Sequence, residues 1–160
     1  MDPEIKKKVL RELTYGLYVV TAANGDDIAA GTVTWLSQAS FAPPLVMIAV
    51  RVDSHLHAVV ERSRAFAVNI LAQGEQDIAA AFFAAGQPKD GCIHGYRFEA
   101  GPVVGAPLLV DLPAWFEARV TDTVVRGDHT VYVAEVVSAG MRNPQARPLS
   151  LRDTTWSYGG

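Results

Sequence analysis

The sequence predicts a mainly β protein, an antiparallel barrel with a few helices packed against its outside. Apolar stretches of strand length recur along the chain, and turns that contain Gly, Asn or Asp separate several of them. Only three short segments have the spacing of an amphipathic helix. The 160 residues are 49% apolar and 19% charged, which is typical of one globular domain, here residues 1–160, that folds without disulfides.

The first elements are predicted to be a helix and a β-hairpin. Asp2 can cap the helix and Pro3 fits its first turn. Apolar residues then follow with helical spacing: Ile5, Val9, Leu10 and Leu13. The hairpin is expected to join strands at Tyr15–Ala23 and Ile28–Ala39, because Asn24-Gly25 supplies a turn that tolerates positive φ.

The middle of the chain is predicted to alternate between strands and short helices. In order these are a strand at Leu45–Val52, a helix from Asp53-Ser54 to about Ser63, a strand at Phe66–Leu71, and a helix around Ile78, Ala81 and Phe82. The first strand is nearly all apolar and is expected to be buried, whereas the second contains one polar residue, Asn69. From Gly86 to Pro107, scattered glycines and prolines predict a loop.

The last third is predicted to form a second hairpin. Trp115–Val125 alternates apolar residues with Glu117, Arg119 and Thr121, which is the pattern of a half-buried strand. Arg126-Gly127-Asp128 can turn the chain, and His129–Val137 is then expected to run back beside the first strand.

Charge and cysteine content limit the classes of partner. The net charge is −3, and the one basic run, Lys6–Lys8, is expected on the solvated face of a helix, so no nucleic acid is predicted as a partner. The single cysteine, Cys92, can form no internal disulfide and suits a reducing cytoplasm. No apolar run is long enough to span a bilayer, so we expect a cytoplasmic protein without a membrane partner.

Several common kinds of active site find no support in the sequence. Cys92 and His94 form the only close Cys/His pair, and His55 and His57 would lie on different faces of a helix, so no metal site is predicted. There is no G-x-S-x-G nucleophile motif, no G-x-G-x-x-G and no Walker loop.

The stretch TVTWLSQASFAPP, residues 32–44, carries many short hydrogen-bonding side chains for a strand. They are Thr32, Thr34, Ser37, Gln38 and Ser40. Each taken alone is best explained as a hydrogen-bonding group of a turn or a strand edge. Asn69 differs, since a buried amide needs partners. A bond to a neighbouring loop and a contact with a ligand are equally open for it.

Two further residues allow either a structural or a binding role. Ser54 is most simply the N-cap of a helix. That helix start, after a strand that ends near Arg51, is also suited to an anion. His129 follows a Gly-Asp turn, where it could be exposed or could face the rim of a pocket.

Six stretches in this order resemble one known family. They are GLYVVTA, AAGTVTWLSQASFAPPLVMIAV, SHLHAVVERSRAFAVNIL, GAPLL, GDHTVYVAEVV and RDTTWSYGG. Together they are similar to the flavin reductase-like, FMN-binding split-barrel family over nearly the whole chain. The resemblance implies a six-stranded antiparallel Greek-key barrel, used as a homodimer with FMN at the subunit interface.

The resemblance also implies roles for particular residues. In that family the block before the double proline lines the isoalloxazine ring, which here gives Thr34, Trp35, Leu36 and Ser37, with Ser40 nearby. Ser54 matches the serine at the phosphate, with Arg51 and His57 as neighbours. Asn69 matches an asparagine beside the flavin, and His129 matches a histidine near the nicotinamide, which makes it the expected catalytic residue.

Some positions depart from the family pattern. Trp35 is bulky where many members have a small residue, and Leu56 replaces a threonine that follows the phosphate serine. Trp156 and Tyr158 are expected to pack over the flavin or the dimer seam.

The activity implied by the resemblance is an NAD(P)H:FMN oxidoreductase that transfers hydride from a nicotinamide to flavin N5. It would supply a partner monooxygenase or another electron acceptor. The alternatives are an FMN-retaining electron-transfer protein with little direct NAD(P)H activity, and an interaction domain with a vestigial pocket. The sequence does not choose between NADH and NADPH.

Overall fold

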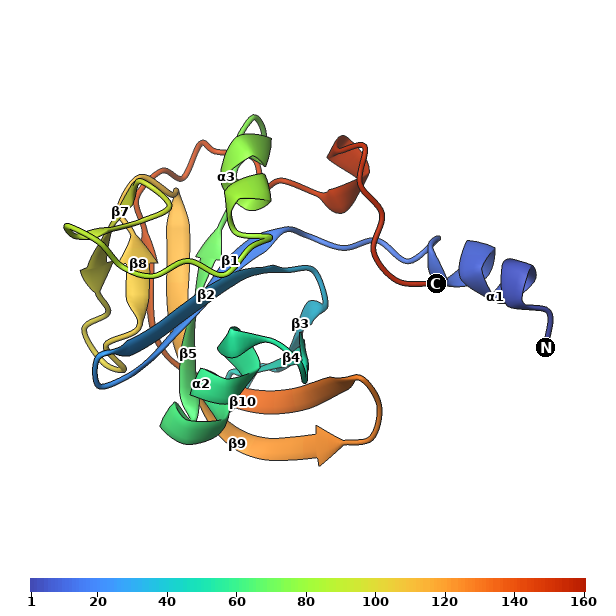
Figure 1. Ribbon diagram of the computed structural model, residues 1–160, viewed down its shortest axis with the longest axis horizontal. Helices are drawn as coiled ribbons and strands as arrows, with labels where there is room; N and C mark the ends of the chain where they lie inside the picture. The colour runs from blue at the N-terminus through green and yellow to red at the C-terminus, as the bar shows by residue number, and fades with distance from the viewer.

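A computed structural model describes residues 1–160 and shows a large curved sheet, a small sheet and a few short helices (Figure 1). The strands of the large sheet are β1 (Tyr18–Asn24), β2 (Asp27–Val33), β3 (Leu36–Ser40), β4 (Leu45–Arg51), β5 (Ala65–Ile70), β9 (Ala114–Val125) and β10 (His129–Met141). The small sheet contains β6 (Cys92–Ile93), β7 (Tyr96–Ala100) and β8 (Pro107–Leu109). The helices are α1 (Pro3–Leu10), α2 (His55–Ser63), α3 (Gln76–Ala81) and the 3₁₀ turn η1 (Leu151–Asp153). The mainly β class is confirmed.

The large sheet curls, and its two edge strands follow one another directly along the chain. Its strand order is β2-β1-β5-β9-β10-β4-β3, and every neighbouring pair is antiparallel. The two edge strands, β2 and β3, are consecutive in the sequence and are separated only by Thr34 and Trp35. The Ala49 N–H of β4 donates to the Trp35 carbonyl at 3.0 Å, which fixes this corner against the sheet.

The prediction of one strand over Ile28–Ala39 is wrong, because the chain bends at Thr34 and Trp35. The Leu36 N–H donates to the Thr34 carbonyl two residues earlier, at 3.0 Å, instead of continuing a ladder. The large sheet therefore has seven strands, one more than the six expected.

The prediction of a loop from Gly86 to Pro107 is also wrong. This region contains β6, β7 and the start of β8, and His94 and Gly95 turn the chain with φ of 51° and 83°. The glycines there mark hairpin turns rather than a structureless segment.

Two strands differ from their expected burial. In β4 only alternate residues are buried, and Met47 is 45% exposed, so the strand is half-buried rather than fully buried. In β9, Glu117 is completely buried although its position was expected to face solvent. Its carboxylate accepts hydrogen bonds from the N–H groups of Val103 and Val104, because the 101–105 turn covers that face of the sheet.

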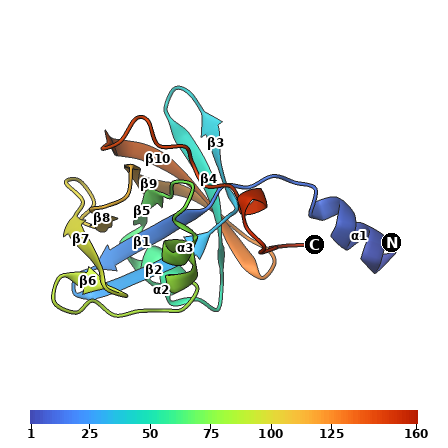
Figure 2. The same ribbon diagram turned by 90° about the horizontal axis from the view of Figure 1, so that it is seen from above.

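The core lies on both faces of the sheet. Val20 and Ala22 of β1 pack with α2 on one face, whereas Val19 packs with Leu17 and the α3 region on the other. This alternation follows from the two-residue period of a strand. The N-terminal helix is outside both cores: Figures 1 and 2 show α1 projecting from the body, and none of its residues is buried. None of the helices is both long and apolar enough to cross a membrane.

Candidate functional site

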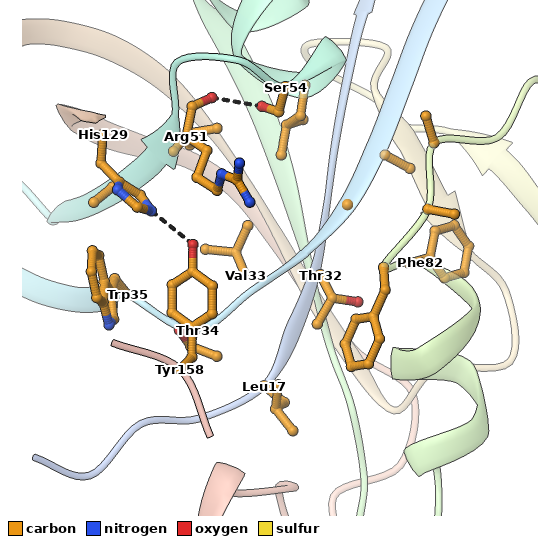
Figure 3. Close-up of a pocket in the computed structure, with 18 of the residues that line it drawn as sticks. Leu17, Thr32, Val33, Thr34, Trp35, Arg51, Ser54, Phe82, His129 and Tyr158 are labelled. Atoms are coloured by element: carbon orange, nitrogen blue, oxygen red, sulfur yellow. Dashed lines mark hydrogen bonds between the residues drawn. The ribbon is translucent and has the colours of Figure 1, made fainter. Parts of the chain in front are cut away.

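An open pocket of about 640 Å³ lies between β2 and β4, beside the bend at Thr34 and Trp35 (Figure 3). Four further elements complete its wall: the start of α2, the residues after α3, the start of β10 and the C-terminal tail. Most of the lining is apolar, with a few polar groups at its edges. A cavity of this size and lining is typical of a site for a small molecule or cofactor.

One end of the pocket is suited to an anion. The Ser54 hydroxyl accepts from the His57 N–H at 3.1 Å and donates to the Arg51 carbonyl at 2.8 Å, so Ser54 is the N-cap of α2. The N–H groups of His55 and Leu56, the first two residues of the helix, have no partner within the protein. Free N–H groups at a helix start attract phosphate and carboxylate groups.

Arg51 adds a cation at the same end but is paired with Asp53. Its guanidinium contacts the Asp53 carboxylate at 2.5 and 3.0 Å, and both side chains are more than half exposed. Hydrogen bonding to Asp53 raises the pKa of Arg51, and the same bond lowers the pKa of Asp53. An anion that entered here would compete with Asp53 for the guanidinium.

The corner between β2 and β3 brings two unpaired polar atoms to the pocket. Thr34 and Trp35 both line it, and neither the Thr34 hydroxyl nor the Trp35 indole nitrogen has a hydrogen-bond partner, although both atoms are buried. Buried polar atoms are rarely left unpaired, because each such group costs about 1–3 kcal/mol. Thr34 is therefore suited to a partner supplied by a ligand, whereas the Trp35 nitrogen lies beside Gly159, 3.9 Å from the position of a Cβ built on that glycine.

His129 stands at the rim with both ring nitrogens engaged. Nδ1 lies 2.7 Å from the Asp128 carboxylate and Nε2 lies 2.8 Å from the Tyr158 hydroxyl (Figure 3). The Trp35 ring packs beside the imidazole, with 4.5 Å between ring centroids. Hydrogen bonding to His129 lowers the pKa of Asp128, and burial raises the pKa of Tyr158.

Five predicted site residues lie outside the pocket lining: Leu36, Ser37, Ser40, His57 and Asn69. Leu36, Ser37 and Ser40 belong to β3, where Ser37 is exposed and its hydroxyl donates to the neighbouring Gln38 carbonyl at 3.1 Å. His57 is in α2, but its ring turns towards β10 and lies 2.9 Å from the Thr130 hydroxyl. Leu36 is half-buried and packs against the core on the α2 face of the sheet.

Asn69 is also away from the pocket, and its amide is used inside the protein. Nδ2 donates to the carbonyls of Val19 (3.1 Å) and Pro107 (3.3 Å), and Oδ1 accepts from the Leu109 N–H (2.8 Å). The side chain is fully buried. Of the two roles that the sequence left open, these contacts favour the structural one, although the partners lie in the strands β1 and β8 and not in a loop.

Sequence reasoning missed the wall opposite Arg51. Phe82 and Phe83 follow α3 and line the pocket, and Trp156 packs edge-on against Phe83 with 4.8 Å between ring centroids. Leu17, just before β1, completes the floor (Figure 3). The adjacent phenylalanines and the aromatic C-terminus were the available signals, but neither shows which surface it covers.

The chain is a β protein with a curled antiparallel sheet, and its pocket beside a helix start is suited to an anionic small molecule or cofactor. The family model described as "Flavin reductase like domain" matches residues 10–157. The chain belongs to this flavin reductase-like family, and the resemblance seen in the sequence is confirmed.

Three curated relatives share the family. The chain is 34% identical to "Flavin reductase (NADH)" of Kitasatospora aureofaciens, covering 93% of this chain and 78% of that protein. It is 33% identical to the "NADPH-flavin oxidoreductase" of Streptomyces viridifaciens, over 87% and 72% of the two chains. It is 28% identical to the reductase component of the 4-nitrophenol 4-monooxygenase/4-nitrocatechol 2-monooxygenase of Rhodococcus opacus, over 90% and 76%.

The structural comparison gives the same family. The NADH:FAD oxidoreductase SgcE6 of Streptomyces globisporus C-1027 superposes with a TM-score of 0.79 and 26% identity, over 94% of this chain and 90% of that one.

A further relative by sequence, 29% identical, is diflavin flavoprotein A 1 of Synechocystis, but the chain covers only 24% of that longer protein.

Proposed function

We propose that the protein is a flavin reductase that binds FMN in the pocket and reduces it with NADH or NADPH. Family membership and the relatives named as flavin reductase and NADPH-flavin oxidoreductase support an oxidoreductase that uses flavin and NAD(P)H. The observation that carries the proposal is the pocket itself, where an anion site and the unpaired Thr34 hydroxyl belong to the lining of one largely apolar cavity.

The residues present fit a flavin. A flavin mononucleotide has one phosphate and one planar ring with polar edges, and the pocket offers partners for both. Ser54, Arg51 and the free N–H groups of α2 would hold the phosphate. The hydroxyl of Thr34 would bond the ring edge, which would satisfy an atom that the protein leaves unpaired.

When bound, the flavin supplies the chemistry, accepting a hydride from the nicotinamide at its N5 atom. The chain's own residues bind and orient. The apolar walls, which include Phe82 and Leu17, would exclude water from the ring, and the Asp128 carboxylate fixes the His129 imidazole at the rim. His129 would then contact the nicotinamide, and no protein nucleophile is needed.

We propose FMN rather than FAD as the flavin that is held, on the strength of the sequence resemblance. Two measurements on the purified protein test cofactor and activity together. The protein is first titrated with FMN and with FAD. NADH or NADPH is then added while nicotinamide absorbance is followed. If the protein binds neither FMN nor FAD, the proposal is refuted. Tighter binding of FAD would keep the reductase and change its cofactor.

An FMN-retaining electron-transfer protein is the second candidate, and one contact favours it. Tyr158 occupies the hydrogen-bonding edge of His129, which a nicotinamide would otherwise reach. Flavin binding without oxidation of either nucleotide would select this alternative.

Two assembly proposals accompany the function. A homodimer is supported by apolar side chains that stand in solvent on and near α1, since Ile5 and Val9 are each 61% exposed and Leu13 is 55% exposed. With β2 and β3 counted as one bent strand, the large sheet of each copy would have the six strands of the resemblance. A monooxygenase partner is supported by the Rhodococcus relative, which is named as a reductase component. Sedimentation of the purified protein tests the dimer.

A further inference from the structure

The last five residues, Trp156–Gly160, form a C-terminal tail that crosses the rim of the pocket. Trp156, Ser157 and Tyr158 line the cavity, and no regular secondary structure follows η1. The only backbone N–H of the tail with a partner is that of Trp156, which donates to the nearby Thr154 hydroxyl at 3.1 Å. The tail is therefore not tied to the sheet by a backbone ladder.

Side-chain contacts hold the tail in place. Trp156 packs on Phe83, Tyr158 packs edge-on against Trp35 and bonds to His129, and the Gly159 carbonyl accepts from the Arg11 side chain at 3.0 Å. None of these contacts joins two backbone groups. Segments held by few contacts, without a hydrogen-bonded ladder, open at low free-energy cost.

Tyr158 makes the contacts that a second planar ring would make in this place. Its ring meets the Trp35 indole edge-on, with 5.1 Å between centroids, and its hydroxyl bonds to His129 Nε2 at 2.8 Å. A nicotinamide also combines a flat ring with one polar group, its carboxamide. Tyr158 and a nicotinamide therefore cannot both lie against Nε2 of the His129 ring.

The closed tail has a cost of its own. The Trp35 Nε1–H is buried without a partner, and Gly159 packs so closely on this indole that a Cβ built there would stand 3.0 Å from Trp35 Cζ2. Opening the tail would return this donor to water or to a ligand, which removes a desolvation penalty. The contacts that close the tail are thus opposed by an unpaired donor beneath it.

We propose that Tyr158 is an internal occupant of the nicotinamide position, so that the tail must leave His129 before NAD(P)H can bind. This inference rests on the proposed function and deepens it, since it identifies the residue that controls access of the second substrate. A ligand that binds only the open form has an apparent affinity reduced by the fraction of molecules that are open. Weakening the closed form should therefore tighten nicotinamide binding.

Two variants weaken closure from different sides. Tyr158→Phe removes the hydroxyl that bonds to His129 but keeps the ring, and Arg11→Gln removes the anchor of Gly159 outside the pocket. Each loses about one hydrogen bond, so KM for NADH or NADPH should fall about fivefold with kcat changed by less than about twofold. Tyr18→Phe and Lys8→Gln are the matched controls, because they make the same chemical changes away from the pocket and the tail.

A readout without turnover accompanies the kinetics. Titration of the FMN-loaded protein with NAD⁺ or NADP⁺ should show the same fivefold gain in affinity, and hydrogen exchange in residues 156–160 should be faster in both variants. The wild-type FMN titration and turnover assay test the proposed function separately. If the wild type binds FMN and turns over, yet KM and dinucleotide affinity are unchanged or weaker in both variants, the inference is overturned. A change in FMN affinity alone would also overturn it, because the tail would then cover the flavin.

Discussion

Replacing Asn69 with Ala separates a structural role of this residue from a role at the flavin. Its amide joins three strands through bonds to the Val19 carbonyl of β1 and to the Pro107 carbonyl and Leu109 N–H of β8. Val110, the residue that follows β8, donates its N–H to the carbonyl of the β7 residue Arg97. N–H groups alternate in direction along a strand, so that of Leu109 points away from β7 and depends on Asn69.

The size of the effect follows from these bonds. In Asn69→Ala the Leu109 N–H stays buried without an acceptor, which costs about 1–3 kcal/mol. The lost bond to Val19 adds about 1 kcal/mol, whereas the Pro107 carbonyl keeps a bond from the Thr21 hydroxyl at 2.6 Å. The free energy of unfolding should fall by about 3 kcal/mol, and Tm by roughly 9 °C at about 3 °C per kcal/mol.

Urea unfolding followed by circular dichroism measures the first quantity. Thr21→Val is the matched control: it removes a single bond to Pro107 with little change in volume, and should cost only about 1 kcal/mol. FMN affinity, measured where both proteins are folded, should change by less than about threefold, because no atom of Asn69 reaches the pocket. If Asn69→Ala is as stable as wild type but binds FMN tenfold or more weakly, the reasoning is refuted, and Asn69 would be a residue of the flavin site.

Three other substitutions test the pocket. Ser54→Asp keeps an N-cap but places a negative charge at the proposed phosphate site, so FMN affinity by titration should fall about tenfold or more; unchanged affinity would move the phosphate elsewhere. His129→Ala should lower kcat with NAD(P)H by more than it lowers FMN affinity, and the reverse order would make His129 a flavin ligand. Thr34→Val removes an unpaired buried hydroxyl, so the unloaded protein should be as stable as wild type or more stable in urea, while FMN binding weakens about fivefold. A loss of stability without a loss of FMN affinity would show that Thr34 has a structural partner instead.

Local signals in the sequence were sufficient for several elements. Asp2 caps α1 through bonds from the N–H groups of Glu4 and Ile5, and Ser54 caps α2, as their positions before helical patterns predicted. The turn at Asn24-Gly25 also lies where expected, with Gly25 at a φ of 62°. Capping and turn chemistry act within a few residues, so the sequence itself carries them.

About half of the predicted site residues lie together in the pocket: Thr34, Trp35, Arg51, Ser54 and His129. These positions end a strand or turn the chain, so both their side chains and their backbone groups are available to a cavity. Leu36, Ser37 and Ser40 were assigned to the site from the family resemblance, but they lie in β3 outside the pocket lining, beyond a break at Thr34 and Trp35 that was not predicted. Once a strand is interrupted, its two-residue alternation no longer tells which face the next residues occupy.

The sequence by itself determined the mainly β class, most of the strands and helices, and the family, because these depend on local patterns and on motifs in a fixed order. Only the tertiary structure decided that Asn69 bonds to β8, that Phe83 lines the pocket, and that Tyr158 bonds to His129. Such contacts join residues far apart in the chain, as the bond between Arg11 and Gly159 joins positions 148 residues apart. Local patterns hold no information about which distant groups meet, since that is fixed only when the sheet curls and its core packs.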